Sequence, residues 1–142
     1  MVNFTIQIEP GLPINEQIVF AVKKAIMNGQ LKAGDRFPSV RELSREFRIN
    51  PVTVQKAITK LVNEQLLLIQ PGIGSLVSQP SLPSQAELDQ FFQSEVEHLV
   101  IEAKRLSIKQ DALFAQIKGY WTTNSTQNKK AKRAMGGFFL AV

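Results

Sequence analysis

Hydrophobic residues first alternate with polar ones and then recur at the spacing of a helix. The alternation predicts an extended segment at the start of the chain, with Val2, Phe4, Ile6 and Ile8 on one face. The helical spacing predicts a first helix whose apolar stripe is Ile14, Ile18, Val22, Ala25 and Ile26. Asn28-Gly29 ends this helix, because glycine readily adopts the left-handed conformation of a C-cap.

Two short helices joined by a tight turn are expected next. Ser39 and Glu42 form a capping box at the start of the first of them. In a capping box the serine side chain accepts from the amide of residue 42, and the glutamate reaches back to the amide of residue 39. Leu43 and Phe47 face inward, and Arg48-Ile49 forms the turn.

The helix after the turn begins with Asn50 as N-cap and Pro51 at the first helical position, where its missing N–H costs nothing. Its buried stripe is Val54, Ile58, Leu61 and Val62. The other side chains then face elsewhere: Val52, Thr53, Gln55, Lys56, Thr59 and Lys60. Strands over residues 66–69 and 75–77 enclose Pro71-Gly72-Ile73-Gly74, which predicts a hairpin or wing.

A long amphipathic helix is predicted after a linker at residues 79–83. Ser84 and Glu87 form a capping box at its start. The helix extends to residue 106, and its apolar stripe is Leu88, Phe91, Phe92, Val96, Leu99, Ala103 and Leu106.

The last predicted helix is capped by Ser107 with Gln110 and ends at Gly119. The periodic pattern then stops, and residues 129–133 are basic. This tail has three interpretations: an arm that adds phosphate affinity, a solvated end, or a segment that folds onto a dimer through Phe138-Phe139-Leu140. The residues alone leave all three open.

These elements predict a mainly α fold of the α+β class. It consists of an N-terminal winged helix-turn-helix and a short C-terminal two-helix segment. The expected division is a DNA-binding domain at 1–78, a linker at 79–83, a helical dimerisation segment at 84–119 and a basic tail of unknown structure at 120–142.

Composition narrows the partners and the chemistry. The 142 residues are 44% hydrophobic, enough for a core, and the formal net charge of +5 favours an anionic partner such as nucleic acid. Residues 1–78 hold nine Lys/Arg against six Asp/Glu, whereas residues 79–119 hold four against six. The absence of cysteine excludes disulfides and thiolate metal sites and is compatible with a cytoplasmic location. No apolar run reaches the length of a membrane span.

An enzyme is the rival function class, and the sequence does not favour it. There is no cysteine, a single histidine (His98), no phosphate-binding loop and no recognisable pair of carboxylates. One histidine forms no metal site by itself. We therefore expect no catalytic residues, no metal and no cofactor.

Residues 13–77 resemble the DNA-binding domain of the GntR family of bacterial transcriptional regulators. The matching stretches are Glu16-Gln17-Ile18, Gly29 to Arg36, Pro38 to Leu43, Asn50 to Val54 and Gly72-Ile73-Gly74. The two-helix segment after the wing is similar to that of the YtrA subfamily, which lacks a large effector domain and dimerises through its C-terminal helices. Two positions differ from the family: Arg48 stands in place of a glycine in the turn, and Ile73 in place of an arginine between the wing glycines.

DNA recognition is expected from the start of the helix after the turn, because the N-terminal residues of a recognition helix reach base edges in the major groove. Gln55 can bond adenine at N6 and N7, while Thr53 and Val52 can contact thymine methyl groups. Asn50 and the exposed amides beside it suit a phosphate. The resemblance implies a base or phosphate contact for Arg41. Further candidates are Arg36, Ser39, Lys56, Gly72 and Gly74.

Several of these residues also have a purely structural interpretation. Ser39 suffices as an N-cap, and Thr53 can merely support the neighbouring cap. Arg41 can be a surface ion-pair partner. The two wing glycines can serve the turn alone, because a positive φ explains them without DNA.

The apolar stripe beyond residue 84 bears on the oligomeric state. The helix either folds back onto its own DNA-binding domain or pairs with a second chain about a twofold axis. We favour the homodimer, because so wide a stripe would otherwise expose a large patch. The expected interface residues are Leu88, Phe91, Phe92, Leu99, Leu106 and Leu113.

The sequence thus predicts a dimeric transcriptional regulator that binds double-stranded DNA at a pseudo-palindromic operator. The resemblance implies a repressor of a nearby operon, such as one of transporter genes. The alternative is an architectural or protein-interaction winged-helix module without sequence-specific regulation. The residues identify no effector.

Overall fold

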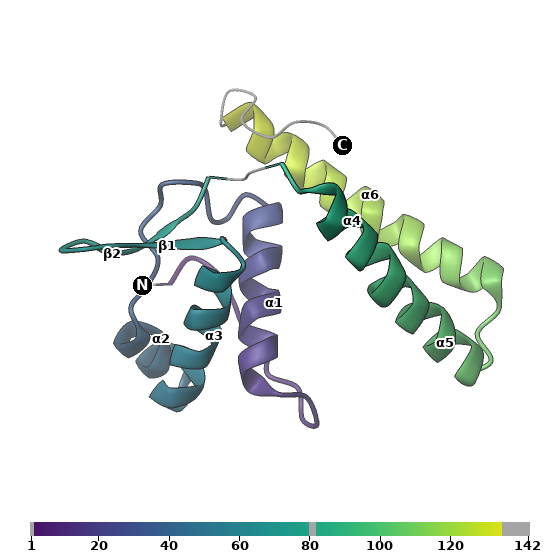
Figure 1. The fold of residues 1–142 in the computed structure, drawn as a ribbon, viewed down its shortest axis with the longest axis horizontal. Helices are drawn as coiled ribbons and strands as arrows, with labels where there is room; N and C mark the ends of the chain where they lie inside the picture. The colour runs from purple at the N-terminus through teal and green to yellow at the C-terminus, as the bar shows by residue number, and fades with distance from the viewer. Residues whose placement is uncertain (1, 80–81, 135–142) are drawn as a thin grey trace. The chain divides into compact units, whose positions relative to one another are not determined.

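The computed structural model describes the backbone of residues 2–79 and 82–134, and the side chains of residues 2–79 and 82–122. The chain forms two compact units, one built on residues 1–80 and the other on residues 81–126 (Figure 1). The described residues form helices and one small antiparallel sheet, which confirms the predicted mainly α fold class.

Three helices and a hairpin make up the first unit. They are α1 (Ile14–Met27), α2 (Val40–Phe47), α3 (Pro51–Asn63), β1 (Leu67–Gln70) and β2 (Gly74–Val77). Helix α3 lies at the centre, since α1, α2 and β1 all pack against it. Three elements of the unit therefore hold α3 in place.

The segment that precedes α2 pairs with strand β2 of the hairpin. In the hairpin, Leu67 lies opposite Val77 and Gln70 opposite Gly74. Arg36 forms an isolated antiparallel bridge with Leu76. The amide of Phe37 donates to the carbonyl of Ser75 over 2.8 Å. These contacts attach strand β2 of the wing to the segment just before α2, which the hydrophobic pattern did not anticipate.

The core of the first unit is built largely from the predicted stripes. Its fully buried members include Ile18, Val22, Leu43, Val54 and Leu61. Two stripe positions are less buried than predicted: Ile14, in the first turn of α1, is 39% exposed, and Val62 is half-buried. Ala57 is fully buried instead, because its small side chain lies where α3 packs against its neighbours.

The N-terminal segment joins no sheet, since none of residues 2–9 is in a strand and residues 3 and 4 form a bend. Its alternation reflects docking onto the core. Phe4 is 4% exposed and its ring stacks on Phe37, with ring centroids 5.8 Å apart. Val2 and Ile6 pack against the same core, while Ile8 is 42% exposed.

The second unit pairs two long helical segments. The first comprises α4 (Gln85–Phe91), a π-helical turn η1 (Phe92–Val96) and α5 (Glu97–Arg105). The second is α6 (Gln110–Ala134), of which residues up to 126 belong to this unit. The predicted capping box at Ser84 is confirmed, because the Glu87 amide donates to Ser84 Oγ and the Ser84 amide donates to Glu87 Oε2.

Ser107 does not cap the last helix, contrary to the prediction from sequence. Its φ is +58°, and it ends the preceding helix instead. The Ser107 amide donates to the Lys104 carbonyl, and the Ile108 amide donates to the Ala103 carbonyl. This bonding is that of a Schellman motif, in which the left-handed residue is more often glycine. Helix α6 begins only at Gln110.

Gly119 does not end α6, which was also predicted wrongly. The helix continues to Ala134, so residues 120–134 of the predicted tail are helical. Glycine weakens a helix interior by about 1 kcal/mol relative to alanine, which does not suffice to stop it. Residues 80–81 of the predicted linker and residues 135–142, with Phe138-Phe139-Leu140, lie outside the described residues.

Candidate DNA-binding surface

The start of α2 is capped by Ser39. Its Oγ accepts from the Glu42 amide over 3.1 Å and donates to Glu42 Oε1 over 3.3 Å. The predicted N-cap is confirmed, but the second half of the predicted capping box is wrong. The Glu42 carboxylate binds the serine hydroxyl instead of the amide of residue 39, and it lies beside the first turn of α2, where a negative charge is favourable.

The turn between α2 and α3 is held by one unusual backbone conformation and one side chain. Arg48 has φ +54° and ψ +47°, the left-handed conformation that glycine adopts most readily. Ser44 Oγ donates to the Ile49 carbonyl over 2.6 Å, and Ile49 is buried. These contacts fix the path of the chain into α3.

The start of α3 carries the predicted cap. Asn50 Oδ1 accepts from the Val52 amide over 2.8 Å, and Pro51 occupies the first helical turn. Because the opposite face of α3 is buried, Gln55 and Lys56 are exposed, and Val52 is 63% exposed. Thr53 is half-buried.

A shallow groove runs along the first half of α3, beside the start of α2. It is lined by Val40, Pro51, Val52, Gln55, Lys56 and Thr59. Gln55 Nε2 donates to Thr59 Oγ1 over 3.3 Å across one helical turn. The structure thus brings three predicted contact residues, Val52, Gln55 and Lys56, to one concave surface. Val40 and Thr59 were not predicted as part of the site, although the i, i+4 spacing of Gln55 and Thr59 indicates that they are neighbours.

The other predicted DNA contacts do not line this groove. Ser39 and Arg41 are exposed at the start of α2, and exposed Arg36 bridges to strand β2 of the wing. Gly72 and Gly74 are exposed in the wing turn, with φ of +81° and +109°. A side chain at either glycine would be strained, so the turn alone accounts for both.

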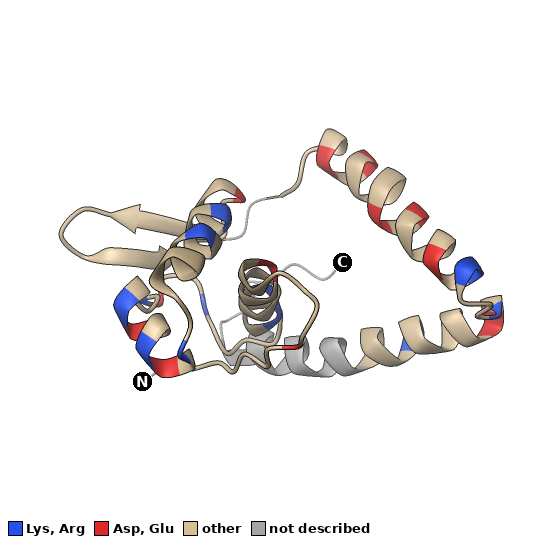
Figure 2. Cartoon of the chain, turned by 90° about the horizontal axis from the view of Figure 1, so that it is seen from below, with Lys and Arg blue, Asp and Glu red and all other residues tan. Residues whose placement is uncertain are grey.

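Cations of this surface are available for phosphate. In the part of the chain that the structure describes, the ion pairs join Lys23 to Glu64 and Arg105 to Glu102. Arg41 and Lys56 are in neither, so the described residues do not support the interpretation of Arg41 as an ion-pair partner. Figure 2 shows basic residues on α2 and α3 and acidic residues repeating along α4 and α5.

The wing is apolar at its turn and along β1. Ile73 at its turn is 50% exposed, and Leu68 and Ile69 of β1 are 54% and 59% exposed. Apolar side chains can touch sugars and base edges but cannot pair with a phosphate. The predicted contact residues that carry a positive charge therefore lie outside the wing, on α2 and α3 and at Arg36.

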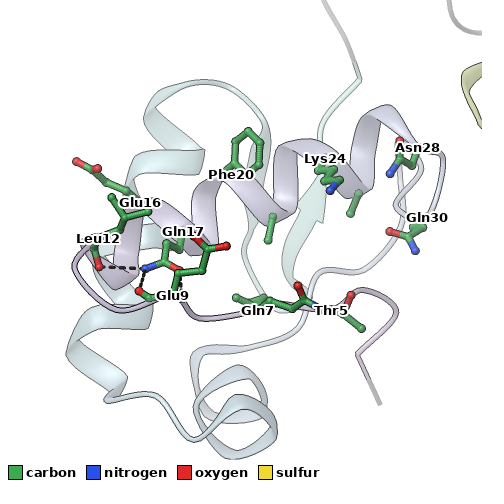
Figure 3. Close-up of a pocket in the computed structure, with 13 residues that line it drawn as sticks. Thr5, Gln7, Glu9, Leu12, Glu16, Gln17, Phe20, Lys24, Asn28 and Gln30 are labelled. Carbon is green, nitrogen blue, oxygen red and sulfur yellow. Dashed lines mark hydrogen bonds between the residues drawn. The ribbon is translucent and has the colours of Figure 1, made fainter. Parts of the chain in front are cut away.

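The first unit also contains a cavity of about 550 Å³ between the N-terminal segment and α1 (Figure 3). Gln17 closes one end: its Nε2 donates to the Glu9 and Leu12 carbonyls, and its Oε1 accepts from the Glu9 amide over 2.7 Å. All of these hydrogen bonds join Gln17 of α1 to the residues that precede this helix. Gln17 thus holds the N-terminal segment against α1.

The second unit exposes much of its apolar stripe. Of the predicted interface residues, Leu113 is half-buried, and the others are 39–63% exposed: Leu88, Phe91, Phe92, Leu99 and Leu106. Ala103 is the one buried hydrophobic residue in the described part of this unit. Two helices thus leave a broad apolar surface uncovered within one chain.

The described residues hold no cluster of three or more His, Asp or Glu side chains suited to a metal ion. None of their helices combines the length and apolarity needed to cross a membrane.

Comparisons with known proteins agree with the geometry. The model of the family described as bacterial regulatory proteins, gntR family, matches residues 14–77, which comprise α1 to β2. The HTH-type transcriptional repressor YtrA of Bacillus subtilis (strain 168) is 33% identical over 116 residues. That match covers 80% of this chain and 89% of YtrA.

Two further similarities separate the first unit from the whole chain. The HTH-type transcriptional repressor NagR of Bacillus subtilis (strain 168) is 41% identical over 71 residues, 50% of this chain but 29% of NagR. A crystal structure of a transcriptional antiterminator from Listeria monocytogenes EGD-e has a TM-score of 0.75 at 25% identity, covering 85% of this chain and 91% of that one. The chain therefore belongs to the gntR family of bacterial regulatory proteins and is a DNA-binding transcriptional regulator similar to YtrA.

Proposed function

We propose that the protein is a homodimeric repressor that occupies a pseudo-palindromic operator and thereby blocks transcription of a nearby operon. The main observation that supports this proposal is the surface at the start of α3, where a capped helix end, exposed polar side chains and unpaired cations lie together. The relatives YtrA and NagR are transcriptional repressors, which supports the direction of regulation.

Each residue of this surface has a role in the proposed complex. Gln55 reads an adenine through N6 and N7, and Val52 contacts a thymine methyl group. Arg36, Arg41 and Lys56 bind phosphates. Asn50 and Ser39 hold the helix ends so that these side chains face the groove, and Thr53, half-buried, contributes through its exposed part.

The second unit supports the dimer. A helical pair whose described part has one buried hydrophobic residue and large exposed apolar side chains gains stability when a second copy covers that surface. Two DNA-binding units related by a twofold axis then contact half-sites about one helical turn apart. Each unit by itself has a low affinity for DNA because its wing lacks a cation, so specificity depends on both units binding together.

The test is selection of bound sites from random double-stranded DNA, followed by comparison of the wild type with Gln55→Ala. We expect a selected pseudo-palindrome, and a loss of preference at one base pair per half-site when Gln55 is removed. The matched control is Lys60→Ala on the same helix, which should lower the affinity for all sequences by a similar factor. No enriched sequence at any salt concentration would contradict the proposal and favour an architectural module.

A further inference from the structure

Gln55 is not a free side chain on the DNA-binding surface. Its Nε2 donates to Thr59 Oγ1 over 3.3 Å, from one turn of α3 to the next. Both residues are exposed, and both line the groove along α3. A long side chain that is tied to its own helix loses rotamer freedom before it meets a ligand.

The bond also determines which polar groups Gln55 has left to offer. A glutamine amide has two N–H donors and one acceptor oxygen. With one N–H bound to Thr59, one N–H and Oε1 remain. Adenine presents one acceptor, N7, and one donor, the N6 amino group, in the major groove. Guanine presents two acceptors there, N7 and O6, which this remaining pair matches less well.

We propose that Thr59 is a positioning residue for base recognition: it holds the Gln55 amide so that one donor and one acceptor face the DNA, and it thereby favours adenine over guanine. The inference rests on the proposed function, in which Gln55 reads a base. Thr59 itself lies a full turn further from the N-terminus of α3 than Gln55 and acts through Gln55, without contacting the base.

The experiment uses the full chain and the operator obtained by selection. Affinities are measured by fluorescence anisotropy at one salt concentration, for the operator and for a variant in which the adenine sensitive to Gln55→Ala is replaced by guanine. Thr59→Val removes the hydroxyl but keeps the shape, and Thr59→Ser keeps the hydroxyl. Because Thr59 is exposed, both variants should fold, which thermal unfolding verifies.

We expect Thr59→Val to reduce the adenine-over-guanine preference by about threefold to tenfold, the range of one neutral hydrogen bond. Thr59→Ser should retain the wild-type preference. Affinity for unrelated DNA should be the same for all three proteins. In a Gln55→Ala background, Thr59→Val should have no further effect, because the side chain that Thr59 holds is gone.

Three outcomes would overturn the inference. An unchanged preference in Thr59→Val would show that Gln55 needs no positioning. An equal loss in the Gln55→Ala background would show that Thr59 contacts the DNA itself. If Gln55→Ala alone leaves every base preference unchanged, the assigned role of Gln55 in the proposed function fails as well. The first two leave that role intact, so the failures are distinguishable.

Discussion

Arg48 shows what a single residue contributes to the turn between α2 and α3. It adopts the left-handed conformation in the turn between α2 and α3 without the freedom of glycine. A non-glycine residue there costs about 1 kcal/mol. The bond from Ser44 to the Ile49 carbonyl and the burial of Ile49 hold the turn despite this cost.

Replacing Arg48 with glycine should therefore raise the free energy of unfolding by about 1 kcal/mol. Urea denaturation monitored by circular dichroism measures this. Gln65→Gly is the matched control, because Gln65 also has a positive φ, +63°, but follows the far end of α3. It should give a similar gain. A lower stability for Arg48→Gly would show that the arginine side chain stabilises the turn by more than its backbone costs.

At the level of elements, three helix starts were predictable, whereas helix ends were predictable only where a glycine marks them, as at Gly29 after α1, which has a φ of +78°. Ser39, Asn50 and Ser84 were each identified as N-caps, because capping depends on one side chain and the amides two or three residues ahead. The ends at Ser107 and Gln65 have positive φ without glycine. A left-handed end of this kind leaves no mark in composition, since the residue that adopts it is an ordinary one.

Gly119 illustrates the opposite error and supplies a prediction. It lies inside α6, and nothing stands within 4 Å of where a Cβ would be. Gly119→Ala should raise the stability of the helical unit by about 0.5–1 kcal/mol, measured as an increased midpoint of thermal unfolding. Gly72→Ala is the control: it has equal space but a φ of +81°, so it should destabilise. A gain in both variants would contradict the conformational argument.

At the scale of the whole molecule, we propose that the first unit binds DNA and the second pairs two chains. The first unit has a closed core, whereas the second leaves its apolar stripe exposed. In the proposed dimer, burial of this stripe drives association, since each square ångström of apolar surface removed from water contributes about 25 cal/mol.

Sedimentation at micromolar concentration should accordingly give a dimer for the wild type and a monomer for Leu99→Lys. The lysine would place a charge in the apolar interface, which is strongly unfavourable. Glu97→Lys makes a larger change of charge off the stripe and should remain dimeric. The monomeric variant should keep weak binding to a half-site and lose tight binding to the full operator. A monomeric wild type would refute the proposed dimer.

The sequence by itself determined the elements of the first unit and the class of the protein, because caps, turns and hydrophobic periodicity act over a few residues. Asn50, Pro51 and the stripe beginning at Val54 were sufficient to orient α3. Tertiary structure alone decided how separate segments meet: the bridge from Arg36 to the wing, the groove shared by Val40 and Thr59, and the docking of Phe4. These contacts join residues far apart in the chain, and their energies depend on packing that no local pattern encodes.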